Sequence, residues 1–173
     1  MIAFRNELPD LLKDLRLKGV CVELGVAGGR FSAHLLENSP IRCLYSIDGW
    51  SGDRGHGLTQ YVQALRRLNV YGRRSIVVRA RFEEALELFP DNSLDCVYVD
   101  GYAHTGNKSG KTLGDWWPKV KAGGLLGTHD YSHHWPLNVI AVDRFFDDMG
   151  SEGQVWITAR DEYPSWFLRK APG

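Results

Sequence analysis

Residues 20–37, VCVELGVAGGRFSAHLLE, hold a strand, a turn and a helix in direct succession, and they decide the fold class of this 173-residue chain. Val20–Leu24 has the apolar composition of a buried strand, and the apolar residues from Phe31 to Leu36 recur at helical spacing. The turn between them is rich in glycine, which lets the backbone approach a ligand closely. A strand that leads directly into a helix predicts a sheet whose strands are joined by helical crossovers.

The alternation of strands and helices continues along almost the whole chain. Strands joined by helices pair in parallel, whereas the last two strands have no helix between them and must pair antiparallel. We therefore expect an α/β, Rossmann-like fold: a mostly parallel seven-stranded sheet with helices on both faces and a C-terminal antiparallel strand pair. No repeat or linker divides the sequence, so residues 1–173 are expected to form a single domain. Hydrophobic periodicity places the other helices at 4–17, 58–65, 83–89, 113–120 and 136–149, and the other strands at 43–47, 75–78, 94–99, 125–128, 154–158 and 165–169.

Composition narrows the class of protein. The 21 basic and 21 acidic side chains balance, so no global field attracts nucleic acid or an anionic membrane surface. Charges interrupt the N-terminal stretch and no run of about 18 apolar residues occurs, so we expect a cytoplasmic protein without membrane contact. Cys21, Cys43 and Cys96 lie in apolar runs without metal-ligand spacing, which indicates reduced thiols that act as small apolar residues.

Polar residues gather where the predicted parallel strands end. Glu23, Asp48, Asp100 and Asp130 lie in or directly after the first, second, fourth and fifth strands. In such sheets ligands bind beyond the carboxyl ends of the strands, so we expect these acids to share one site. Five of the six histidines fall on the same rim or in the loops that leave it: His56, His104, His129, His133 and His134.

The first turn indicates what kind of ligand this site holds. Glu23–Gly29 does not match the dinucleotide pattern GxGxxG, because Ala27 replaces its second glycine. An acid beside the turn suits a ligand with a positive ammonium or sulfonium group. Asp48 closes the next strand about 25 residues later, where an acid can accept hydrogen bonds from both ribose hydroxyls. A nucleoside with an amino-acid-like end fits this pair of acids, and S-adenosylmethionine fits it better than NAD.

Three longer segments carry a family resemblance. The stretches VELGVAGGRFSAHLL (22–36), LYSIDGW (44–50) and DCVYVDGYAH (95–104), followed by WWPKVKAGGLLGTHDY (116–131), resemble class I S-adenosylmethionine-dependent methyltransferases. More narrowly, they resemble the branch with macrolide-sugar O-methyltransferases and cephalosporin-hydroxylase-like proteins, over roughly residues 18–148. The resemblance implies a methionine-binding turn at Glu23, Gly25 and Gly29, ribose binding by Asp48, an adenine border at Arg81 and Phe82, and a position for Asp100 near the sulfonium and the acceptor.

The expected reaction is methyl transfer to a hydroxyl oxygen of a small molecule, which requires removal or stabilisation of charge on that oxygen. The catalytic candidates are Asp100, His104, His129 and Asp130, with either histidine as the general base. Asp100 and Asp130 follow neighbouring strands, so they are also candidate ligands of a divalent cation, Mg²⁺ before others. The alternative is that both aspartates work by hydrogen bonding alone.

Other functions and further pocket residues complete the set of hypotheses. A nucleotide-dependent oxidoreductase and a non-catalytic nucleoside-binding protein are the alternatives on the same fold, and neutral charge disfavours RNA methylation.

Trp116 or Trp117 is expected in the core. Trp50 and Trp135, in rim loops, are expected to line the acceptor pocket, and a second copy in a homodimer is a candidate for completing that pocket.

Overall fold

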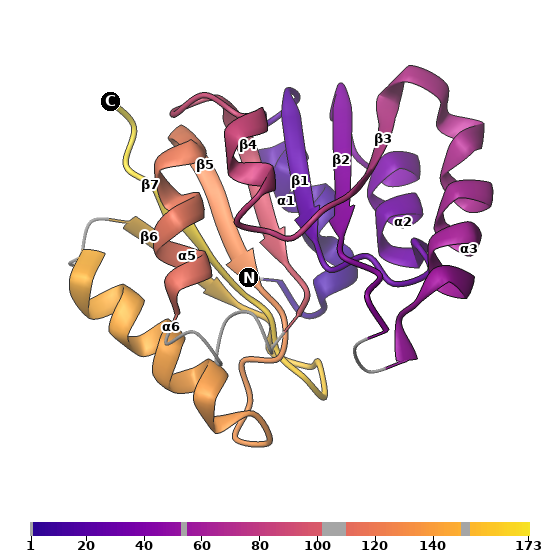
Figure 1. The fold of residues 1–173 in the computed structure, drawn as a ribbon. Coiled ribbons are helices and arrows are strands. Elements are labelled where there is room, and N and C mark those ends of the chain that lie inside the picture. Colours follow the sequence, from indigo (N-terminus) through magenta and orange to yellow (C-terminus); the bar gives the residue numbers. More distant parts are fainter. Residues whose placement is uncertain (1, 53–54, 102–109, 150–152) are drawn as a thin grey trace.

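The computed structural model describes residues 2–52, 55–101, 110–149 and 153–173, and a seven-stranded sheet forms its centre (Figure 1). The sheet has the order β3-β2-β1-β4-β5-β7-β6. Its first five strands in chain order pair in parallel, and β7 pairs antiparallel with both β5 and β6. The predicted fold class and the antiparallel pair are thus confirmed. The strands are β1 (Val20–Leu24), β2 (Cys43–Asp48), β3 (Ser75–Arg79), β4 (Leu94–Val99), β5 (Val120–Thr128), β6 (Gly153–Ile157) and β7 (Trp166–Lys170).

Helices cover both faces of the sheet, as expected. The α-helices within the described residues are α1 (Leu8–Asp14), α2 (Arg30–Asn38), α3 (Leu58–Leu68), α5 (Lys111–Trp116) and α6 (Pro136–Met149). Short 3₁₀ helices are η1 (Arg5–Glu7), η3 (Asn69–Arg74), η4 (Ala85–Leu88) and η5 (Trp117–Lys119). None of the helices in the described part of the chain is long and apolar enough to cross a membrane.

The strands divide their side chains between two cores because successive residues of a strand point to opposite faces. On one face Cys21 and Cys96 pack with α1 and α2, and on the other Val22 and Val97 pack with α5 and α6. Trp116 is fully buried in the second core, which confirms its structural role. Cys21 and Cys96 are buried free thiols and Cys43 is partly buried.

Three predicted helices are shorter than expected. The helix predicted over residues 113–120 ends at Trp116, because Pro118 lacks a backbone N–H and cannot continue it; η5 and then β5 follow. β5 runs through Gly124, where an added Cβ would lie 3.0 Å from two carbonyl oxygens of β4, so this strand needs glycine to pack. The first helix is divided into η1 and α1, and only a 3₁₀ turn forms within residues 83–89.

Candidate functional site

A cavity of about 600 Å³ opens beyond the carboxyl ends of β1, β2, β4 and β5. It lies where the order of parallel strands reverses, between β1 and β4, which is the position at which α/β sheets bind ligands. The predicted site residues that line it are Glu23, Gly25, Asp48, Arg81, Phe82, Asp100, His129 and Asp130.

The other predicted residues have different places. Gly29 precedes α2 and packs against α3, so it shapes the turn without lining the cavity. The prediction that Trp50 lines the pocket is wrong: its side chain is 2% exposed, and its Nε1 donates a hydrogen bond to the Ala27 carbonyl. Trp135 is also not among the lining residues. His104 lies outside the described residues, so its role stays a prediction.

The turn after β1 is held close to the end of β4. Gly25 has a φ of +93°, and an added Cβ would lie 2.5 Å from the Asp100 carbonyl oxygen. Only glycine combines this backbone conformation with this close approach. The turn therefore lines the cavity directly beside the first residues after β4.

Asp48 fastens this turn to β2. One of its carboxylate oxygens accepts hydrogen bonds from the Val26 and Ala27 N–H groups at 2.9 and 3.0 Å, and the other accepts one from the Trp50 N–H at 2.9 Å. A carboxylate has about four acceptor positions, so these contacts leave one of them for a ligand hydroxyl. The sequence predicted a ligand role for Asp48 but not this structural role.

Glu23 is the buried acid of the site. Its side chain is 1% exposed, and one carboxylate oxygen accepts a hydrogen bond from the Ser32 hydroxyl, which in turn accepts one from Ser46 at 3.0 Å. Burial raises the pKa of Glu23 to about 8, since the low-dielectric surroundings disfavour its charged form. A cationic group that entered the cavity beside it would favour the carboxylate again.

Arg5 is a site residue that sequence reasoning missed. Its guanidinium contacts the Asp100 carboxylate at 2.8 Å, lies 4.7 Å from the centre of the Phe31 ring, and lines the cavity. The segment is held in place because the Arg5 N–H donates to Asp161 at 2.7 Å. No local pattern marks Arg5, because its partner Asp100 is 95 residues away.

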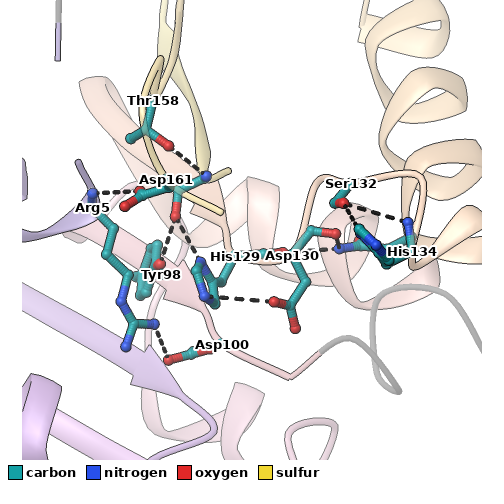
Figure 2. A network of polar contacts seen from close by, with 11 residues as sticks. Arg5, Tyr98, Asp100, His129, Asp130, Ser132, His134, Thr158 and Asp161 are labelled. Carbon is teal, nitrogen blue, oxygen red and sulfur yellow. Dashed lines mark hydrogen bonds and ion pairs between the residues drawn. The ribbon is translucent and has the colours of Figure 1, made fainter. Parts of the chain in front are cut away.

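His129 and Asp130 directly follow β5 and line the same cavity, and Figure 2 shows the two side chains next to each other. Asp130 has a φ of +62°, a conformation that aspartate tolerates better than most residues. The buried side chain of Asn138 holds this turn by donating to the carbonyl oxygens of both residues, at 2.8 and 2.9 Å. Nothing in the sequence pattern pointed to Asn138.

The described residues do not fit the predicted Mg²⁺ site. Arg5 already occupies one oxygen of Asp100, and Asp130 faces His129 Nε2 at 3.5 Å. Within the part of the chain that the structure describes, no group of three or more His, Cys, Asp or Glu side chains could hold a metal ion. The positive charge beside Asp100 comes from the Arg5 guanidinium of the protein itself.

Comparisons with known proteins agree with this architecture. The sequence matches a family of methyltransferase domains over residues 22–131, more than half of its length, and the chain therefore belongs to this methyltransferase family. No curated protein matches the sequence at a significant level.

Three solved structures illustrate the likeness in fold. One is the O-methyltransferase from Bacillus cereus in complex with SAH, with TM-score 0.70, 12% identity, and coverage of 95% of this chain and 79% of that chain. A second is the S-adenosylmethionine-dependent O-methyltransferase from Thermotoga maritima, with TM-score 0.63, 12% identity, and coverage of 100% and 68%. A third is an rRNA methylase from Streptococcus thermophilus, with TM-score 0.66, 14% identity, and coverage of 94% and 96%. These likenesses establish the fold, and the acceptor must be argued from the site.

Proposed function

We propose that this protein transfers a methyl group from S-adenosylmethionine to a hydroxyl oxygen of a small molecule. The observation that carries the proposal is the placement of two acids, Glu23 and Asp48, in one cavity at the ends of neighbouring strands of a methyltransferase-family fold. The volume of about 600 Å³ lies in the range of small-molecule sites.

The cavity has distinct partners for each part of this cosubstrate. The Glu23 carboxylate is suited to the ammonium of the methionine end, and the nearby Arg5 guanidinium to its carboxylate. Asp48 keeps one acceptor position for a ribose hydroxyl. Phe82 offers an apolar surface for adenine, beside the exposed side chain of Arg81.

The acceptor end of the cavity is formed by Asp100, His129 and Asp130. S-adenosylmethionine supplies an electrophilic methyl group, and the protein must place the acceptor oxygen in line with it and take the hydroxyl proton. Carboxylates and an imidazole suit a hydroxyl acceptor. The motif resemblance to macrolide-sugar O-methyltransferases also supports oxygen as the acceptor atom.

The first test is calorimetric titration with S-adenosylhomocysteine, which has the same nucleoside and amino-acid ends. We expect Asp48→Ala to weaken binding by at least about 1.5–3 kcal/mol, the usual loss of a charged hydrogen bond, because the variant also loses the contacts that hold the Val26 and Ala27 N–H groups. Asp14→Ala, which changes an exposed aspartate of α1 outside the cavity lining, is the matched control and should bind as the wild type does. Absence of binding to the folded wild type would overturn the proposal.

The second test identifies the acceptor class. The protein is incubated with methyl-labelled S-adenosylmethionine and a panel of hydroxylated metabolites, and the products are analysed by mass spectrometry. Label in a methyl ether supports the proposal. Label that enters only added RNA, or that is bound to nitrogen or carbon, would refute the hydroxyl part.

A further inference from the structure

A chain of polar contacts joins Tyr98 to His129 through Ser165, and Figure 2 shows Arg5 next to Tyr98 at the start of this chain. Arg5 lies against the Tyr98 hydroxyl, which is 2.9 Å from the Ser165 Oγ, and this Oγ is 3.0 Å from His129 Nδ1. Tyr98 and Ser165 are both fully buried, so water does not compete for these hydrogen bonds.

The direction of each hydrogen bond in this chain follows from the first member. The buried Tyr98 hydroxyl needs an acceptor for its proton, and its hydrogen bond within the described residues is with Ser165. The Tyr98 O–H then points to Ser165, and the Ser165 O–H points to His129 Nδ1. Nδ1 of His129 is therefore a hydrogen-bond acceptor.

We infer that His129 is held as the neutral tautomer with its proton on Nε2, and that it donates this proton's hydrogen bond to Asp130, which is the proton acceptor in methyl transfer. His129 is then a positioning residue, and Arg5, Tyr98 and Ser165 position it in turn. The assignment of Asp130 rests on the proposed function; the tautomer of His129 does not.

Two further observations agree with this direction of hydrogen bonding. If His129 were protonated on both nitrogens, its Nδ1–H would donate to Ser165 Oγ, which already accepts a hydrogen bond from Tyr98. The buried Ser165 hydroxyl hydrogen would then have no acceptor among these groups. Burial also lowers the pKa of His129, although Asp100, Asp130 and Asp161 raise it and Arg5 lowers it further. The imidazole therefore stays neutral.

The choice of Asp130 over Asp100 follows from the ion pair at Asp100. Arg5 holds Asp100 in an ion pair at 2.8 Å, and a proton taken up by Asp100 would break this pair. His129 Nε2 is 3.5 Å from Asp130 Oδ1, a contact that is long for a hydrogen bond, as is common in catalytic sites without substrate. In the reaction the acceptor oxygen bonds to the methyl carbon, the carbon–sulfur bond breaks with its electron pair left on sulfur, and the hydroxyl proton moves to Asp130.

The tautomer can be measured directly by nitrogen-15 NMR of the histidine side chains in the wild-type protein. We expect a protonated Nε2 and an unprotonated Nδ1 for His129. In Tyr98→Phe, Ser165 no longer receives a hydrogen bond and can accept one, so a population protonated at Nδ1 should appear. Tyr71→Phe, which removes a tyrosine hydroxyl that contacts Glu37 on the surface, should leave the His129 signals unchanged.

Ser165→Ala serves as the second variant if Tyr98→Phe does not fold, since it removes the donor to Nδ1 and should also shift the tautomer equilibrium. A proton on Nδ1 in the wild type would overturn the inference, as would identical His129 signals in both variants and the wild type. This outcome is independent of methyl transfer, so it remains informative if the proposed function fails.

The activities of three variants show whether His129 acts as a hydrogen-bond donor or as the general base. A glutamine amide nitrogen can replace Nε2 and an asparagine nitrogen can replace Nδ1, so His129→Gln should retain activity within about tenfold of wild type, whereas His129→Asn should not. Asp130→Asn should lose turnover by about a hundredfold or more. Equal loss in His129→Gln and His129→Asn together with an active Asp130→Asn would make His129 the base and overturn the inference.

Discussion

Glu23→Gln should stabilise the protein at alkaline pH, because it removes a carboxyl group that the fold keeps away from water. Glu23 has a pKa of about 8 in the folded chain, against an ordinary value of 4.5. Between these values the folded protein retains a proton that the unfolded chain releases, so stability falls as pH rises through this window. Each factor of ten in proton affinity corresponds to about 1.4 kcal/mol, so the full cost above pH 8 is about 5 kcal/mol.

The variant keeps the local hydrogen bond, since an amide oxygen can accept from Ser32 as the carboxylate does. Its gain in the free energy of unfolding should therefore be below about 1 kcal/mol at pH 5 and increase to between about 2 and 5 kcal/mol at pH 9. Urea unfolding followed by circular dichroism at a series of pH values measures this difference. Glu87→Gln, which changes an exposed acid, is the matched control and should follow the wild-type curve.

The same substitution should weaken S-adenosylhomocysteine binding at pH 8 by about 1.5–3 kcal/mol, because the ligand's ammonium loses a charged partner. A variant that is more stable and binds more weakly would show that the buried acid is kept for the ligand. Parallel stability curves for the wild type and Glu23→Gln across pH 5–9 would refute the reasoning, since the carboxyl would then titrate equally in the folded and unfolded chain.

Three further predictions concern the turn, the N-terminal arginine and the metal. Gly25→Ala should destabilise the fold by about 2–5 kcal/mol, since both its positive φ and the Asp100 carbonyl oppose a Cβ; Gly72→Ala, with positive φ but open space, should cost only about 1–2 kcal/mol in the same thermal unfolding assay. Arg5→Met should lower kcat/KM by about tenfold or more through loss of the charge beside Asp100, with Arg16→Met as the control for an exposed arginine; equal rates in both variants would contradict a role for Arg5 in the site. Exhaustive chelation should leave turnover unchanged, because Arg5 supplies the positive charge at Asp100, and activity that is lost on chelation and restored by Mg²⁺ would show that a cation is required.

Much of the fold and part of the site follow from local patterns in the sequence. A strand or helix that is buried on one face has apolar residues at a regular spacing, and this spacing changes where β1 ends and α2 begins. Parallel strands joined by helices must end at one edge of the sheet, so Glu23, Asp48, Asp100 and Asp130 could be placed together before the structure was known. The acidic character of this edge of the sheet also follows from the sequence, because the residue types at these four positions are known without the tertiary structure.

What these side chains do was decided by contacts between residues far apart in the chain. Asp48 binds the backbone of the first turn, Arg5 reaches Asp100 across 95 residues, and the insertion of β7 beside β5 brings Ser165 to His129. No regular spacing in the sequence marks such contacts, because they depend on how whole strands and helices pack against one another. Sequence alone therefore determined that acids and histidines share a site, whereas only the tertiary structure decided which of them is paired, buried or held in one tautomer: pairing and desolvation depend on distances in space, which local sequence does not encode.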